Sequence, residues 1–217
     1  MEDETMRSLS GVQTYGRTMI IQGEGKVSAI PDVAAVIIGV QADGADIGSM
    51  QEENNIKMAR IIEAMIQQGV PRERIRTAEY RLFPQYDYEG GQQIFKGYRL
   101  IHTIKVEVQE AEKAGALIDS AVQHGANIVS DITFSVSSPE TLYTRALTLA
   151  LQNAQQKAAA VAAYLNIHIY PIPYKIEEIS PAQVVPYQTS GFIKAEGTPL
   201  EPGLIQFESV VRVLFHY

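Results

Sequence analysis

The chain has 217 residues, a formal net charge of −7 and a hydrophobic share of 46%. A chain of this length buries roughly 70% of its unfolded surface, which excludes disorder and small scaffolds that need disulfides or metals to fold. It contains no cysteine, so disulfides, thiolate metal sites, iron–sulfur clusters and a cysteine nucleophile are excluded. The acidic balance, without clustered Lys or Arg, argues against a nucleic-acid-binding surface.

Residues 1–17 mix acidic, Ser, Gly and Thr residues and predict a flexible polar tail. They lack the basic start and the run of roughly 7 to 15 apolar residues that mark a secretory signal. As written, the chain is therefore expected to be cytoplasmic, and a periplasmic or extracellular location is the alternative if a leader was removed. No stretch reaches the roughly 18 apolar residues of a membrane span, so none is predicted.

Two strands open the regular part of the chain, over residues 19–21 and 33–40, with a connection marked by Gly and Pro. From residue 47 to 66, apolar residues recur at three- and four-residue steps and predict an amphipathic helix. Within this helix, Ser49-Met50-Gln51-Glu52 has the spacing of a capping box.

A long hairpin is predicted next, with arms at residues 75–86 and 94–108 around the turn-rich residues 87–91. Apolar and polar residues alternate along the second arm, which indicates a sheet with one packed and one solvated face. The residues expected on the packed face are Leu100, His102, Ile104, Val106 and Val108.

A second helix is predicted over residues 111–124, ended by Gly125, and a strand over 128–136 follows. The third helix begins with Ser138 as N-cap and Pro139 in the first turn. It continues to Leu165, and its buried stripe is rich in alanine, so a neighbouring element can approach it closely.

Six of the ten prolines fall in residues 167–206, which predicts a surface excursion with one short strand at 174–179. The last alternating segment, 206–215, predicts a strand that returns to the sheet beside residues 19–22. We expect one domain over residues 18–217.

The order strand, helix, strand, strand, helix, strand from residue 33 to 136 indicates an α+β fold. Its predicted core is a ferredoxin-like split βαβ unit (β-α-β-β-α-β), with an extra N-terminal strand, a third Ala-rich helix and C-terminal strands.

The Gly-Glu-Gly-Lys run at residues 23–26 resembles a phosphate-binding loop only superficially. Walker A spacing requires glycine where Ile20 stands, and a Ser or Thr where Val27 stands. We therefore interpret these glycines as a strand-ending turn.

Four histidines, His102, His124, His168 and His216, are dispersed without the i, i+4 spacing of a metal site, so no metal or cofactor is predicted. His124 is placed to complement the dipole at a helix C-terminus. His102 falls among apolar neighbours and is interpreted as a hydrogen-bonded core histidine. No serine-nucleophile motif occurs, and the adjacent glutamates at 52–53 and 177–178 point in different directions, so no catalytic residue is proposed.

Aromatic side chains crowd the predicted hairpin. Without interleaved basic residues, they favour cross-strand pairing or a subunit interface over stacking on a nucleic base. The candidate interface or ligand-contact residues are Tyr80, Phe83, Tyr86, Tyr88, Phe95, Tyr98 and His102.

These segments together resemble the SIMPL domain family, bacterial proteins long catalogued as a domain of unknown function. The resemblance spans residues 18–216. The segments that carry it are Gly23-Glu24-Gly25-Lys26-Val27 with Pro31-Asp32, Arg76-Thr77 leading to Pro84-Gln85-Tyr86-Asp87-Tyr88, Gly97-Tyr98-Arg99, Gly125-Ala126-Asn127, the alanine-rich helix with Lys157, and Thr198-Pro199 through Glu201-Pro202-Gly203.

The resemblance implies proteins that are commonly exported to the periplasm or cell surface, that are associated with oxidative-stress tolerance in some bacteria, and that self-assemble. It supplies no catalytic residues. The chain departs from the commoner family pattern because it shows no signal peptide, so a periplasmic location is expected only if a leader was removed.

Two functional hypotheses remain open. The first is a non-enzymatic module that works as a homo-oligomer, with strand edges and the tyrosine-rich hairpin reaching a neighbouring subunit. The alternative is a small-ligand-binding protein or enzyme with a pocket between the sheet and the Pro-rich segment, where His102, Tyr98 and Arg99 would be the first residues to test.

Overall fold

The computed structural model describes residues 17–187 and 197–217, and the side chains of residues 180–187 lie outside this description. The polar tail predicted for residues 1–17 therefore lies almost wholly outside the described residues. The described chain separates into two compact units, so the expected single domain stays a prediction. We call Ser28–Pro139 with Val184–Gln206 the hairpin unit, and Met1–Val27, Glu140–Gln183 and Phe207–Tyr217 the α3 unit.

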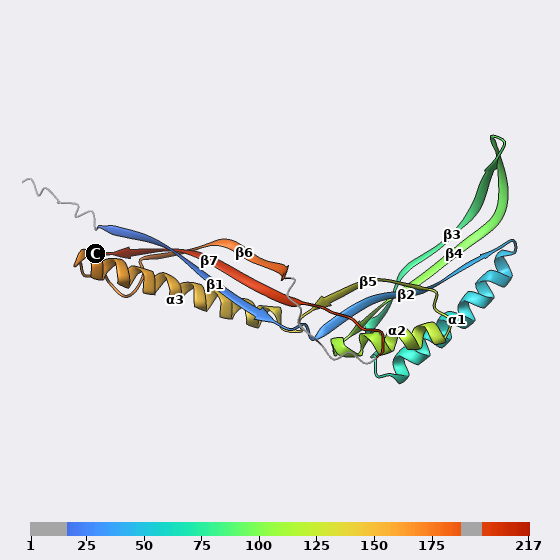
Figure 1. Ribbon diagram of the computed structural model, residues 1–217, viewed down its shortest axis with the longest axis horizontal. Helices are drawn as coiled ribbons and strands as arrows, with labels where there is room; N and C mark the ends of the chain where they lie inside the picture. Colours follow the sequence, from blue (N-terminus) through green and yellow to red (C-terminus); the bar gives the residue numbers. More distant parts are fainter. Residues whose placement is uncertain (1–16, 188–196) are drawn as a thin grey trace, which may run out of the picture. The chain divides into compact units, whose positions relative to one another are not determined.

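The hairpin unit is a four-stranded antiparallel sheet with two helices on one face (Figure 1). The strand order is β3-β4-β2-β5. In chain order the elements are β2 (Val33–Gly44), α1 (Ile47–Gln67), β3 (Ile75–Glu89), β4 (Gln92–Val108), α2 (Ala114–Gln123) and β5 (Ile128–Ser135), with short 3-10 turns at Arg72–Arg74 and Ala111–Lys113. The α+β class is confirmed, whereas the ferredoxin-like arrangement in detail stays a prediction.

The core of the hairpin unit forms because alternate residues of β2 and β4 face the two helices. Ile38 and Val40 of β2 are fully buried, as is Ile104 of β4. They pack with Ile61 of α1 and Leu117 of α2. Each such side chain contributes about 1.5–3 kcal/mol on burial, so this layer holds α1 and α2 on the sheet.

Helix α1 begins one turn earlier than the capping-box spacing implied. Its N-cap is Asp46, whose carboxylate accepts a hydrogen bond from the Ser49 N–H at 2.8 Å. Ser49 itself lies inside the first turn. The predicted capping box was wrong because an Asp three residues earlier takes the capping position.

The α3 unit is a three-stranded sheet, order β1-β7-β6, with the long helix α3 on one face (Figure 1). Its elements are β1 (Thr18–Ala29), α3 (Pro139–Leu165), β6 (Lys175–Tyr187) and β7 (Leu204–His216). The predicted C-terminal strand is confirmed beside β1, and the predicted short strand at 174–179 is longer than expected.

The two glycines of β1 let α3 approach the sheet closely. A Cβ on Gly23 would lie 2.8 Å from the Cβ of Ala154, and one on Gly25 would lie 2.9 Å from the Cβ of Leu149. The helix presents a buried alanine stripe to this surface, made of Ala146, Ala150, Ala154, Ala158 and Ala162. The strand-ending turn expected at residues 23–26 was wrong: these residues lie inside β1, and the glycines serve helix packing.

Candidate functional site

The β3–β4 hairpin extends beyond the rest of its sheet (Figure 1). Strand β2 pairs with β4 only as far as Gly44 opposite Tyr98, whereas β3 and β4 continue to pair out to Glu89 opposite Gln92. Residues 85–97, which we call the hairpin tip, therefore form a two-stranded ribbon. Such a ribbon is marginally stable by itself, because no further strand or helix of the described residues pairs with it.

A bulge in β4 rearranges the aromatic residues of the tip. The pairing register shifts between Gln85 and Tyr86, where Lys96 is left without an opposite residue. Gly97 adopts φ +124°, a conformation that side chains other than glycine rarely take. Strict alternation would place Phe95 and Tyr98 on opposite faces, but the extra residue brings them to the same face.

Three aromatic rings consequently form a continuous row, which we call the aromatic row. The Phe95 ring lies edge-on between Tyr86, at a centroid distance of 5.7 Å, and Tyr98, at 5.2 Å. Edge-to-face contacts at these distances are favourable, so the rings support one another on the ribbon. Even so, 48% of both Tyr86 and Phe95 is exposed, which leaves an apolar surface that no described element covers.

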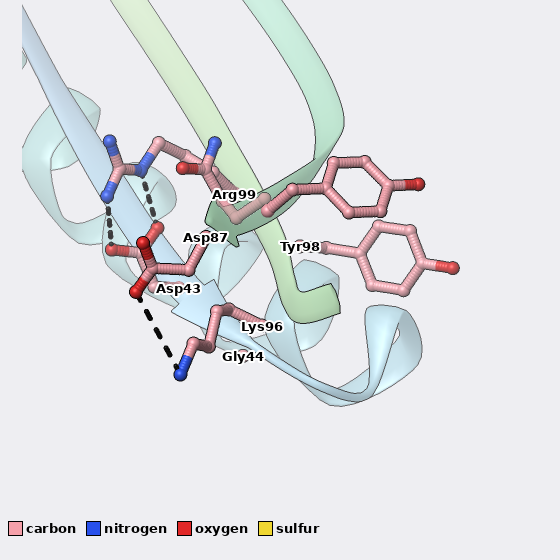
Figure 2. Close-up of a pocket in the computed structure, with 8 residues that line it drawn as sticks. Asp43, Gly44, Asp87, Lys96, Tyr98 and Arg99 are labelled. Carbon is pink, nitrogen blue, oxygen red and sulfur yellow. Dashed lines mark hydrogen bonds and ion pairs between the residues drawn. The ribbon is translucent and has the colours of Figure 1, made fainter. Parts of the chain in front are cut away.

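Charged side chains occupy the other side of the ribbon (Figure 2). Arg99 donates two hydrogen bonds to Asp43 on β2, at 2.7 and 2.9 Å. Lys96 pairs with Asp87 at 3.9 Å and with Glu89 at 3.6 Å. The hydrogen bonds from Arg99 lower the pKa of Asp43, and the same contact raises the pKa of Arg99.

A shallow pocket of about 290 Å³ lies beside these charges. Asp43 and Arg99 line it, together with Lys96 and the strand at Tyr98, whose ring points away from the Asp43–Arg99 pair (Figure 2). Both cations that line the pocket are paired with carboxylates, Arg99 with Asp43 and Lys96 with Asp87. His102 does not border it, so the structure does not bring His102, Tyr98 and Arg99 to one pocket.

His102 belongs to a separate polar cluster between β4 and α1. Its Nδ1 lies 3.1 Å from Nδ2 of Asn54, a fully buried residue of α1, and Tyr80 packs edge-on against its ring at 5.0 Å. The tyrosine hydroxyl accepts a hydrogen bond from Gln51 of α1 at 3.3 Å. Burial lowers the pKa of His102, which favours the neutral ring that accepts the amide hydrogen.

The seven residues singled out from the sequence thus fall into several places. Tyr86, Phe95 and Tyr98 make the aromatic row, and Tyr80 and His102 make the polar cluster. Phe83 lies under the guanidinium of Arg81, at 5.5 Å from its ring centroid. By strand alternation this is the face of Arg99, opposite the aromatic row. Tyr88, 71% exposed, lies two residues before the turn.

Two residues that matter here, Asp43 and Asn54, were not anticipated. Asp43 meets Arg99 only because of the β2–β4 register, which leaves no mark on the local sequence pattern. Asn54 stands at a position of α1 where the helical spacing of the apolar residues predicts a buried side chain. A buried polar side chain needs a hydrogen-bond partner, so this position was a visible signal in the sequence.

Among residues 17–187 and 197–217, no group of three or more His, Cys, Asp or Glu side chains is arranged to hold a metal ion. No helix in this part of the chain is long and apolar enough to cross a membrane.

The fold and the hairpin define the class of protein: an α+β protein of two compact units, whose β3–β4 hairpin carries the exposed aromatic row. The chain belongs to the SIMPL family, described as a protein of unknown function (DUF541), whose model matches residues 19–215. The family resemblance is confirmed.

Several named proteins are similar to this chain. The uncharacterized protein YggE of Escherichia coli strain K12 is 26% identical over 209 residues, which cover 92% of this chain and 83% of that protein. YggE of Edwardsiella ictaluri is 23% identical over 208 residues, 93% of this chain and 87% of that protein. The 26 kDa periplasmic immunogenic protein of Brucella melitensis is 26% identical over 154 residues, 69% of this chain and 62% of that protein.

Proposed function

We propose that this protein is a non-enzymatic member of the SIMPL family that works by assembling with copies of itself through the hairpin tip. The observation that carries the proposal is the aromatic row, a preorganised and exposed apolar surface on a ribbon that overhangs its sheet. Exposed patches of this kind mark interaction sites in soluble proteins.

The two sides of the ribbon differ in a way that suits a one-sided interface. Tyr86 and Phe95 supply rigid, partly apolar contact area with little conformational entropy to lose, and aromatic residues are enriched in interface cores. On the other side, Asp87 and Lys96 pair with each other and keep that side hydrated. A second copy that covered the aromatic side would also stabilise a ribbon that is marginal when alone.

The experiment compares assembly masses of matched variants by light scattering after size exclusion. The double variant Tyr86→Ser, Phe95→Ser removes two rings of the row without touching the bulge, and it is expected to yield a smaller, folded species. Tyr164→Ser, which removes an exposed tyrosine of α3, is the control and should leave the mass unchanged. An unchanged mass in the double variant would count against the proposal.

A second variant tests the same surface by shortening the β3–β4 hairpin. Replacing residues 86–96 with Asn-Gly removes the overhang and joins Gln85 to Gly97, which already lie opposite each other, so the rest of the hairpin keeps its register. We expect a folded protein of smaller assembly mass, with circular dichroism as the check on folding.

We also propose that the protein works in the periplasm. Relatives from Brucella carry the word periplasmic in their names, whereas none of the relatives named above supports the cytoplasmic expectation. Osmotic-shock fractionation of the native host, followed by immunoblotting, should recover the protein with periplasmic markers. Recovery with cytoplasmic markers would contradict this location. A role in oxidative-stress tolerance stays a prediction of the family resemblance.

A further inference from the structure

Strand β1 has one free edge. In the three-stranded sheet of the α3 unit, β7 lies between β1 and β6, and no strand of the described residues pairs with the other side of β1. A free edge presents unpaired backbone N–H and C=O groups, which are a template for pairing with a strand of another chain. Proteins therefore protect such edges with charged side chains or cover them with another element.

Two side chains of α3 occupy this edge. The Glu24 N–H donates a hydrogen bond to Oδ1 of Asn153 at 3.2 Å, and Nζ of Lys157 donates one to the carbonyl oxygen of Gln22 at 3.0 Å. Gln22 and Glu24 are two residues apart, so their backbone groups point to the same side of the strand. The helix thus supplies one acceptor and one donor at the positions where an added strand would supply the same groups.

The geometry of helix and strand makes this arrangement possible. The two side chains are four residues apart on α3, a rise of about 6 Å, and the two backbone groups are two residues apart in β1, about 7 Å. The helix also lies very close to the strand, because the intervening residue is a glycine. A Cβ on Gly23 would lie 2.1 Å from the carbonyl oxygen of Ala150.

The fold does not need these two contacts to satisfy the backbone of β1. Both hydrogen bonds lie at exposed positions, where water can pair with the same N–H and C=O groups. A hydrogen bond that replaces one to water adds little to stability, and a lysine held in one conformation loses side-chain entropy. The main consequence of the contacts is that a competing strand is excluded.

We infer that Asn153 and Lys157 close the free edge of β1 against the addition of a strand from another chain. The strand that fits this edge best is β7 of a second copy, because β7 is the native partner of β1. Its alternating apolar residues are exposed in a chain that has not finished folding. Folded copies of the protein consequently do not associate through the edge of β1.

The test uses the full-length protein and a fluorescein-labelled peptide with the sequence of β7, residues 204–216. The double variant Asn153→Ala, Lys157→Ala opens the edge and preserves α3, because alanine is the best helix former. In a fluorescence anisotropy titration this variant should bind the peptide at least tenfold more tightly than the parent does. The control Gln156→Ala, at an exposed position of α3, should bind no better than the parent. A peptide of the same composition in scrambled order should not distinguish the proteins.

Two results would overturn the inference. One is equal peptide binding by the double variant and the parent. The other is a double variant that loses stability in urea without gaining affinity for the peptide, which would give the two side chains a purely structural role. If the double variant does not fold, Lys157→Met, which keeps the aliphatic part of the side chain, decides by the same titration. The inference does not rest on the hairpin proposal, so the Tyr86→Ser, Phe95→Ser variant should bind the peptide no better than the parent.

Discussion

Gly97 of β4 packs directly against Gly44 at the end of β2: a Cβ on Gly97 would lie 2.7 Å from the Gly44 carbonyl oxygen. This contact marks the point where the sheet ends and the overhanging ribbon begins. Gly97 also adjoins the bulge at Lys96 that aligns Phe95 with Tyr98. The geometry of the aromatic row therefore depends on a residue that has no side chain.

Gly97→Ala is expected to destabilise the protein and to distort the aromatic row. Its φ of +124° alone costs about 1–3 kcal/mol for a residue with a side chain, and the contact with Gly44 adds to that cost. Urea unfolding measures the loss. Gly90→Ala is the matched control, because Gly90 has φ +60° but no atom within 4 Å of its Cβ position. If both variants lost the same stability, the contact with Gly44 would be irrelevant.

Gly23→Ala is expected to push α3 away from β1. The new methyl group would lie 2.1 Å from the carbonyl oxygen of Ala150 and 2.8 Å from the Cβ of Ala154, and overpacking of this kind costs about 1–3 kcal/mol. Gly48→Ala in α1 provides the contrast: its Cβ would meet only Asp46, at 3.5 Å, so it should be neutral or stabilising by up to about 1 kcal/mol. Thermal unfolding of the two variants against the parent checks the difference in sign.

His102 should make stability depend on pH on the acidic side of neutrality. Burial lowers its pKa in the folded state below the ordinary value near 6.5, so the unfolded chain takes up the proton first. Stability should then be highest above pH 6.5 and fall as the pH drops below it. In His102→Gln this part of the dependence should disappear, as followed by urea midpoints between neutral and mildly acidic pH. A parent and variant that lose stability in parallel over this range would refute the assignment.

Asp32 should make the stability of the folded protein depend on pH in a more acidic range. The Ser137 hydroxyl donates to its carboxylate at 2.5 Å and the Ser137 N–H donates at 2.6 Å, and the hydroxyl contact is the main cause of its lowered pKa. A carboxylate with a lowered folded-state pKa stabilises the protein above its unfolded pKa, near 3.9, and this stabilisation is lost as the pH falls through the folded-state value. Asp32→Asn should be less stable than the parent at neutral pH, with the gap closing toward strong acid. A gap that stays constant with pH would exclude the ionised carboxylate as the cause.

Much of the fold was predictable because it rests on periodicity. The alternation of Val211, Val213 and Phe215 marks a strand with one buried face, and the steps from Ile47 to Ile66 mark α1. These patterns depend only on which residues leave water, so they are visible without knowledge of the neighbours.

The features that shape the candidate site depend on pairing between distant segments and were not predictable. The aromatic residues of the hairpin were visible in the sequence, but their division between two faces depends on the bulge at Lys96. Likewise, Gly23 and Gly25 suggested a turn by composition, whereas their role follows from the approach of α3, more than a hundred residues later. Local propensity contains no information on such contacts.

The central claim, assembly through the hairpin tip, is tested most directly by the absolute mass of the purified parent protein. Light scattering after size exclusion should be repeated over a hundredfold range of concentration, beside the variant with residues 86–96 replaced by Asn-Gly. We predict a stable multiple of the chain mass, independent of concentration, for the parent and a smaller folded species for the variant. A parent that is monomeric at every concentration would contradict the claim.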